Sequence, residues 1–344
     1  MGVTLIEWTG TLRVKDGSMA PGYTFNPWRG CVKISPACAN CYAEKTSKRN
    51  PKVLGEWGYG TNRSHAAPSY WNLPLRWNKE AEKAGERRKV FCASLADVFE
   101  DRSDLVEARH RLFCLIMKTP HLDWLLLTKR PENIRPHLEE IDVWDELPLS
   151  NVWFGTTVEN QEYANLRIPS LMKIPGPVRF LSVEPMLGPV NLRRVIYDHV
   201  TMIDALEGLH GWPIAHAPIP DGVFPINWVI AGGESGSDAR LMHPDWVRGI
   251  RDDCAETKTP FFFKQWGKWR PKLESIAGYP KPICKDEKWG TLQRDGKWWP
   301  VTTPWNGRQD KDSETGEIVM VGLDKKKSGR VLDGLTHNDM PVSQ

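Results

Sequence analysis

The feature that most constrains the fold is a series of short apolar runs that recur along the chain. Each run lacks the polar alternation of a half-exposed strand, and helical periodicity follows it. Continuous apolar runs of this length are typical of strands buried on both faces of a parallel sheet. The runs are Lys89–Ser94, Trp124–Thr128, Asn151–Thr157, Val178–Val183, Asn227–Ala231 and Pro260–Lys264.

The spacing of these runs matches repeated strand–helix units. Successive runs begin roughly 27 to 35 residues apart, with one longer gap, which is the size of a βα unit. An earlier strand at Tyr23–Asn26 brings the number of units to about seven. The sequence therefore predicts an α/β fold built as an incomplete or modified (β/α) barrel of the TIM type. No G-x-G-x-x-G follows the first strand, which disfavours an open dinucleotide-binding sheet.

Two stretches do not fit the repeat. We expect residues 1–266 to form the barrel, with an insertion near 195–224 that accounts for the longer gap. Residues 267–344 are rich in Gly, Pro, Trp and Lys, and we expect them to form an appended lid or small subdomain.

Composition limits the classes of partner and the compartment. The chain has 46 Lys and Arg against 43 Asp and Glu, and a net charge of +3 is too small for a field that coats nucleic acid. No stretch approaches the roughly 20 apolar residues that span a bilayer, and the N-terminus lacks a basic-then-apolar leader. We therefore expect a cytoplasmic protein with no membrane partner.

Three of the seven cysteines, Cys31, Cys38 and Cys41, fall within eleven residues. In a reducing compartment such clustering indicates metal binding or catalysis. Three thiolates on one loop can hold three irons of a cubane cluster and leave the fourth open for a ligand. A structural zinc site needs a fourth ligand, for which His65 and Cys92 are the candidates. Three unligated cysteines are the remaining alternative.

Polar residues follow nearly every predicted strand. The carboxyl ends of barrel strands meet at one face, where functional residues gather. A structural barrel would not need such a set, although a single member can be a salt-bridge or turn residue. The set comprises Asn26, Ser94, Asp97, Thr128, Lys129, Arg130, Thr156, Thr157, Glu159, Ser182, Glu184, Gly232, Gly233, Glu234, Ser235, Lys264 and Gln265.

The cysteine loop resembles that of radical S-adenosylmethionine (SAM) enzymes. Their usual spacing is C-x₃-C-x₂-C, whereas this chain has C-x₆-C-x₂-C, and its aromatic Tyr42 follows the last cysteine. The likeness is closer to a phage- and prophage-encoded branch with a variant three-cysteine motif, and it covers most of the chain. The shared segments are NPWRGCVKISPACANCYAE, FCASLADVFE, LLLTKRP, WFGTTVEN, RFLSVEPMLGP, WVIAGGESG, FFFKQWG and KKKSGRVLDG.

The resemblance implies a [4Fe–4S] cluster on the three cysteines, with SAM on the open iron and a 5′-deoxyadenosyl radical as the product of electron transfer. The family's Gly-Gly-Glu motif follows its second strand, but here Gly232-Gly233-Glu234 follows a later one, so Asp97 and Glu234 both stay candidates for the SAM amine. Further candidate cofactor contacts are Tyr42, Ser94, Thr157, Glu159, Ser182 and Glu184. The resemblance also implies an electron donor such as flavodoxin or ferredoxin, and it is compatible with a partner protein.

Lys129 and Lys264 are the candidate catalytic residues. Lys129 with its neighbour Arg130, or Lys264, could bind a phosphate or carboxylate of the substrate; salt bridges to neighbouring glutamates are the alternative. The segment Lys45–Trp77 interleaves basic and aromatic residues, which suits stacking on a flipped nucleobase, although packing of the aromatics is the competing interpretation. With the phage-like resemblance, a nucleobase or nucleotide is the expected substrate, for DNA modification or repair. Two other functions stay open: a zinc-stabilised nucleic-acid-binding barrel without catalysis, and an iron–sulfur electron-transfer or sensor protein.

Overall fold

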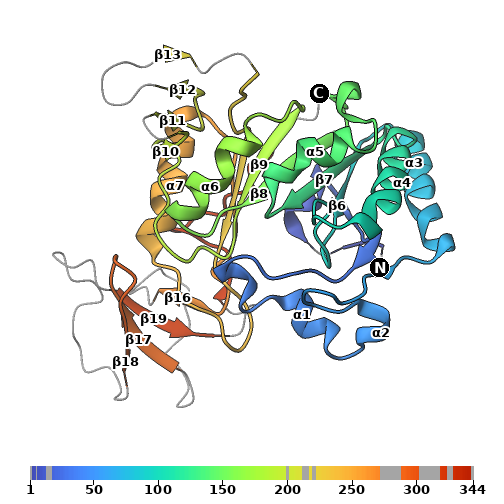
Figure 1. Ribbon diagram of the computed structural model, residues 1–344. Coiled ribbons are helices and arrows are strands. Elements are labelled where there is room, and N and C mark those ends of the chain that lie inside the picture. The colour runs from blue at the N-terminus through green and yellow to red at the C-terminus, as the bar shows by residue number, and fades with distance from the viewer. Residues whose placement is uncertain are drawn as a thin grey trace.

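The centre of the molecule is a seven-stranded parallel sheet that curls into a half-barrel (Figure 1). The structure is a computed structural model that describes residues 2–4, 6–12, 18–198, 201–210, 217–218, 222–271, 288–301, 318–323 and 328–341. The strands neighbour one another in chain order, and the first and last do not pair. They are β3 (Tyr23–Phe25), β6 (Arg88–Cys92), β7 (Leu122–Thr128), β8 (Val152–Thr157), β9 (Val178–Val183), β14 (Trp228–Gly232) and β15 (Phe261–Gln265).

All seven predicted strands are present, each within two residues of its predicted bounds. The apolar runs predict these strands because both faces of the sheet are covered. A strand that is buried on both faces does not alternate apolar and polar residues. An α/β fold with a partial (β/α) barrel is thereby confirmed.

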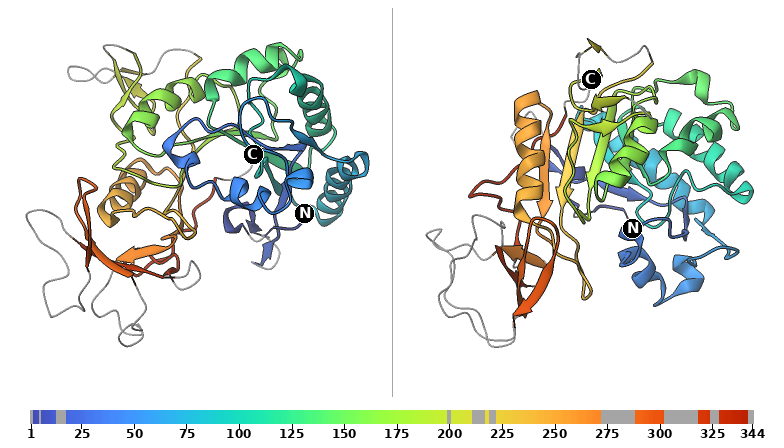
Figure 2. Two further views of the ribbon diagram at one scale, coloured as in Figure 1. Left: turned by 60° about the horizontal axis from the view of Figure 1, so that its bottom comes forward. Right: turned by 60° about the vertical axis from the view of Figure 1, so that its left-hand side comes forward.

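Helices lie along the convex side of the sheet (Figures 1 and 2). A helix separates most successive strands: α3 (Leu73–Ala84), α4 (Val106–Met117), α5 (Ile134–Glu139), α6 (Gln161–Leu171) and α7 (Pro244–Thr257). Local sequence sets the start of α6, because Asn160 accepts a hydrogen bond from the backbone N–H of Tyr163 at 3.1 Å and caps the helix. Two short helices, α1 (Tyr42–Ser47) and α2 (Pro51–Leu54), follow the cysteine loop.

One hydrophobic cluster lies between the sheet and the helices. A second lies on the concave side of the sheet, and alternate residues of the same strands contribute to it. Strand residues such as Phe91, Trp153 and Trp228 line it, and Trp8 from a short 3₁₀ turn at Glu7–Thr9 packs among them. The Trp8 and Phe91 rings meet edge to face, 4.8 Å apart. The N-terminal segment therefore fills the lumen of the half-barrel.

Both edges of the half-barrel are covered by segments near the chain ends. On the β3 edge, Val3 bridges Tyr23 in antiparallel fashion. On the β15 edge, Phe262 bridges Asn338, and the carbonyl of His337 accepts a hydrogen bond from the N–H of Phe263 at 3.1 Å. Covered edges cannot template further strand pairing.

The remaining strands form small antiparallel sheets. In the predicted insertion, β10 (Val195–Ile196), β11 (Met202–Asp204), β12 (Leu209–His210) and β13 (Ala217–Pro218) form one four-stranded sheet. A second one contains β16 (Trp269–Pro271), β17 (Lys288–Leu292), β18 (Trp298–Val301) and β19 (Ile318–Gly322). Two-stranded pairs are β1 (Thr11–Leu12) with β2 (Met19–Ala20), and β4 (Trp28–Arg29) with β5 (Ser64–His65).

The region predicted as an appended segment, 267–344, thus has two described parts. The sheet β16–β19 projects from one end of the half-barrel, whereas residues 328–340 return to the β15 edge (Figure 1). Parts of this region, and of 195–224, lie outside the described residues. None of the helices that the structure describes is long and apolar enough to cross a membrane.

Candidate functional site

A cavity of about 500 Å³ opens at the carboxyl ends of the parallel strands. That volume lies in the range of pockets for cofactors and other small ligands. The cysteine loop, the strand ends and the N-terminal turn supply its wall. Of the predicted site residues, the wall contains Cys31, Cys38, Cys41, Tyr42, Ser94, Asp97, Lys129, Thr157, Ser182, Glu184, Gly233, Glu234 and Lys264.

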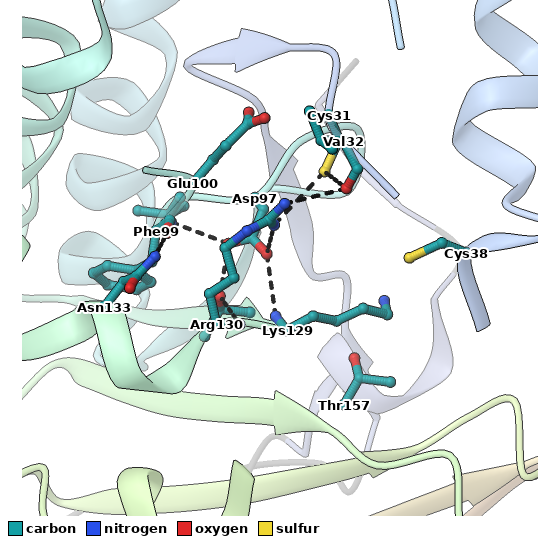
Figure 3. A network of polar contacts seen from close by, with 12 residues as sticks. Cys31, Val32, Cys38, Asp97, Phe99, Glu100, Lys129, Arg130, Asn133 and Thr157 are labelled. Atoms are coloured by element: carbon teal, nitrogen blue, oxygen red, sulfur yellow. Dashed lines mark hydrogen bonds and ion pairs between the residues drawn. The ribbon is translucent and has the colours of Figure 1, made fainter. Parts of the chain in front are cut away.

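The three clustered cysteines share this wall and are all half-buried free thiols. Figure 3 shows Cys31 and Cys38 facing the same space from opposite sides. Burial raises the pKa of Cys31 to about 12, and the nearby Asp97 carboxylate adds to this. Burial also opposes ionisation of Cys38, but the Lys129 ammonium and hydrogen bonds within the loop outweigh it and hold its pKa below the ordinary value. Cys38 is therefore the readier thiolate of the two.

Glu159 anchors the middle of the cysteine loop. Its carboxylate accepts a hydrogen bond from the N–H of Ala37 at 2.9 Å and another from the Ser35 hydroxyl. Arg167 of α6 pairs with it at 2.9 Å, and both side chains are buried. Glu159 is outside the cavity wall, so the structure places this predicted cofactor contact behind the loop, where it fixes the position of Cys38.

Glu234 anchors the end of the loop in a similar way. It accepts a hydrogen bond from the Asn40 side-chain amide at 3.1 Å, next to Cys41. Arg240 donates three more, from its backbone N–H at 2.8 Å and its guanidinium at 2.9 and 2.6 Å. These bonds outweigh the effect of burial and lower the pKa of Glu234.

Asp97 anchors the start of the loop through Arg130. The carboxylate pairs with the Arg130 guanidinium at 2.9 Å, and the same guanidinium donates to the carbonyl of Val32 at 3.1 Å (Figure 3). Asp97 also accepts bonds from the N–H of Phe99, the hydroxyl of Thr128 and the N–H of Lys129. Arg130 lies 4.0 Å from the Cys31 sulfur.

The carboxylates in the wall differ in how much hydrogen-bonding capacity remains. An ionised carboxylate has about four lone-pair sites. Asp97 and Glu234 each accept four bonds within the described chain, whereas Glu184 accepts two, from Lys264 at 2.6 Å and Gln265 at 2.7 Å. Glu184 is thus the predicted acid with room for a ligand.

The glycine pair has a packing role. A Cβ on Gly233 would collide with the carbonyl oxygen of Trp266, because the chain after β15 crosses closely there. The N–H of Gly233 donates to the carbonyl of Gln265 at 2.9 Å, so it is not directed at a ligand. Gly232 is the last residue of β14 and is outside the cavity wall.

The wall does not gather ligands for one metal ion. No group of three or more His, Cys, Asp and Glu side chains in the described residues could hold a single ion. The two candidates for a fourth zinc ligand lie elsewhere: Cys92 is buried in the helix-facing core, and His65 is exposed on β5. A cluster places each thiolate on a different iron, so its sulfurs stand farther apart than those around one zinc ion. Three thiols facing one cavity from one loop fit that donor set.

A family model described as "Protein of unknown function (DUF5131)" matches residues 4–341. The chain belongs to this family. No curated protein and no solved structure matches it.

Several residues at the site carry no pattern that points to them or to their partners in the sequence. Trp8 reaches the cavity from the N-terminal turn, and only the folded lumen explains its position. Arg130, which the sequence predicts as a phosphate or carboxylate ligand, instead pairs with Asp97, which is 33 residues away. Asn40 and Arg240 become partners only through Glu234.

The basic–aromatic segment, Lys45–Trp77, divides between the cavity and the core. Trp57 lines the cavity and pairs with Cys31 through a short parallel bridge. Trp71 and Trp77 are buried, and Trp77 stacks on Tyr23 at 4.3 Å between ring centroids. Trp57 is therefore the tryptophan of this segment that could contact a ligand.

Proposed function

We propose that the protein is a radical SAM-like iron–sulfur enzyme that acts on a nucleobase or nucleotide. One observation carries the proposal: three free thiols from a single loop face a cavity at the carboxyl ends of a curled parallel sheet. In barrels of this kind, that face is where active sites lie.

Cys31, Cys38 and Cys41 would hold a [4Fe–4S] cluster, each thiolate on one iron. When bound, the cluster and SAM supply reductive cleavage of SAM to methionine and a 5′-deoxyadenosyl radical that abstracts hydrogen from a substrate. The three anchors of the loop, Asp97, Glu159 and Glu234, fix the thiols relative to the strand ends. Such preorganisation keeps the thiol positions within the tolerance that a cofactor site needs.

Glu184 is the acid we assign to an ammonium group of the bound cofactor. Its carboxylate accepts one hydrogen bond on each oxygen, whereas Asp97 and Glu234 each accept four in total. The Lys264 ammonium pairs with Glu184 at 2.6 Å. When a ligand ammonium enters, it would bind Glu184 beside Lys264 or replace Lys264 as the partner. The hydroxyls of Thr157 and Ser182, on neighbouring strands, add donors beside it.

The substrate class rests on size, charge and aromatic surface. Trp57 lines the wall and supplies an aromatic ring on which a base could stack. A net charge of +3 suits an enzyme that takes one nucleotide into a cavity better than one that coats DNA. The phage-like resemblance favours DNA modification or repair as the setting, with an external electron donor.

The proposal is tested by the iron content of anaerobically purified and reconstituted protein. We expect about four irons and four sulfides per chain in the wild type, and loss of most of both in Cys31→Ala, Cys38→Ala and Cys41→Ala. Cys114→Ala is the matched control, because Cys114 lies on α4, outside the cavity wall, beside His110.

Full iron in Cys38→Ala would overturn the cluster assignment. Stoichiometric zinc without iron in the wild type would favour the nucleic-acid-binding alternative. A complete cluster with no affinity for SAM would favour the electron-transfer or sensor alternative.

A further inference from the structure

The cations in the cavity wall are unequally partnered. They are Lys33, Lys129, Arg130 and Lys264. Carboxylates neutralise three of them: Lys33 with Glu44 at 2.7 Å, Arg130 with Asp97 at 2.9 Å, and Lys264 with Glu184 at 2.6 Å. Lys129 makes no ion pair with any carboxylate in the part of the chain that the structure describes. One half-buried positive charge is thus left facing the cavity.

Two hydroxyl groups lie beside this charge. Thr128 pairs with Thr156 across β7 and β8, so Lys129 neighbours Thr157, and Thr157 in turn pairs with Ser182 of β9. In Figure 3 the Lys129 ammonium lies between the Cys38 thiol and the Thr157 side chain. Thr157 is 1% exposed and Ser182 6%, and neither hydroxyl donates a hydrogen bond to another described residue.

We infer that Lys129, Thr157 and Ser182 form an anion-binding subsite that takes a carboxylate or phosphate group of a ligand. A half-buried ammonium without a counter-charge is unfavourable, and an anionic oxygen would neutralise it through a charge-assisted hydrogen bond. The two hydroxyls supply further donors to the same anion. Two acids of the wall, Glu184 and Asp97, pair with Lys264 and Arg130 and make no ion pair with Lys129.

This inference rests on the proposed function for the source of the anion. The carboxylate would belong to the methionyl part of SAM, and the phosphate to a nucleotide substrate. Both present charged oxygens that an ammonium and two hydroxyls recognise in the same way. The competing partner for Lys129 is the negative charge of the thiolates themselves, since Cys38 is close by.

The test compares pairs of ligands that differ only in the anion. Binding to iron–sulfur-loaded protein is measured by calorimetry for SAM and decarboxylated SAM, and for a deoxynucleoside and its 5′-monophosphate. In one pair, the wild type should bind the anionic member more tightly. Lys129→Met should weaken that member about ten- to a hundredfold and leave its anion-free counterpart unchanged. The pair that responds identifies the source.

Lys33→Met is the matched control, because it removes a wall cation that already has a carboxylate partner. The joint variant Thr157→Val, Ser182→Ala should weaken the same ligand as Lys129→Met. Equal binding of both members of each pair by the wild type would overturn the subsite.

Unchanged affinities in Lys129→Met, with a lower cluster reduction potential, would also overturn it and assign the charge to the thiolates. Absence of SAM binding in the wild type would contradict the proposed function alone, since the nucleotide pair still tests the subsite.

Discussion

The acidic side chains at this site have different roles, and the hydrogen bonds that each carboxylate accepts determine its role. Asp97, Glu159 and Glu234 follow strands as Glu184 does, yet each is bonded to the cysteine loop or to the arginine that holds it. The sequence could place all four at the carboxyl ends of strands, because strand order follows from the apolar runs. It could not assign their partners, because Arg130, Arg167 and Arg240 become neighbours only in the folded chain.

The anchoring role of Glu159 predicts that its removal releases the loop although all three cysteines remain. Glu159→Gln leaves Arg167 buried without its counter-charge, and breaking such a pair costs about 3–5 kcal/mol. We expect a lower free energy of unfolding by denaturant and less than half of the wild-type iron. Glu162→Gln is the control, because Glu162 is exposed on the same helix. Wild-type iron content in a stable Glu159→Gln protein would contradict the anchoring role.

The free capacity of Glu184 predicts a different outcome for that acid. Glu184→Gln should keep its iron and bind SAM about ten- to a hundredfold more weakly, through loss of a charge-assisted hydrogen bond. Asp97→Asn and Glu234→Gln should lower iron content first, because they hold Val32 and Asn40 of the loop. Calorimetry and iron analysis of the three variants separate these effects. Wild-type SAM affinity in Glu184→Gln would remove it from the cofactor site.

At the scale of elements, the strands were predictable and the closure of the half-barrel was not. Strands such as β8 and β9 are runs of apolar residues, and the length and spacing of these runs predict them. The segments that cover the edges consist of single contacts, such as the bridges of Val3 and Asn338, which have no periodicity. Trp8 is likewise one residue whose burial in the lumen depends on the whole sheet. Periodic signals reveal elements, whereas closure is a tertiary property.

The ionisation of Lys89 depends on how well the segments near the chain ends close the lumen around it. Its ammonium is buried, donates to the carbonyl of Gly10 at 3.1 Å and lies 3.8 Å from the Met340 sulfur, so it touches segments near both chain ends. Burial lowers the pKa of Lys89 from 10.5 to about 8, and Asp123 opposes this only in part. The unfolded chain therefore binds more protons than the folded one between about pH 8 and 10.5.

The free energy of unfolding of the wild type minus that of Lys89→Met should consequently increase by roughly 3 kcal/mol as the pH rises through that window. Below about pH 8 the lysine is charged in both states and its burial cost is present in full. Denaturant unfolding of both proteins from pH 7 to 10.5 measures the difference, with Lys79→Met on the exposed side of α3 as control. If the difference in free energy of unfolding between the two proteins does not change with pH over this range, water reaches Lys89 and the lumen is open.

At the scale of the whole molecule, the half-barrel, the cysteine loop and the N-terminal turn enclose a cavity between them. The loop lies across the carboxyl ends of the strands, and the N-terminal turn closes the lumen below it. The described part of the cavity wall holds three free thiols, an acid with spare capacity and a cation without a carboxylate partner. That combination is the physical basis for proposing a cluster, an amine-bearing cofactor and an anionic ligand in one place.

The most direct test of this account is the production of 5′-deoxyadenosine by the reconstituted protein. Under anaerobic conditions, with dithionite or reduced flavodoxin as electron donor, the wild type should convert SAM to 5′-deoxyadenosine and methionine, detected by chromatography and mass spectrometry. Cys38→Ala should form none, and Cys114→Ala should match the wild type. Wild-type protein that carries a full cluster and binds SAM, yet forms no 5′-deoxyadenosine with either donor or with added nucleotides, would contradict the proposed radical SAM activity.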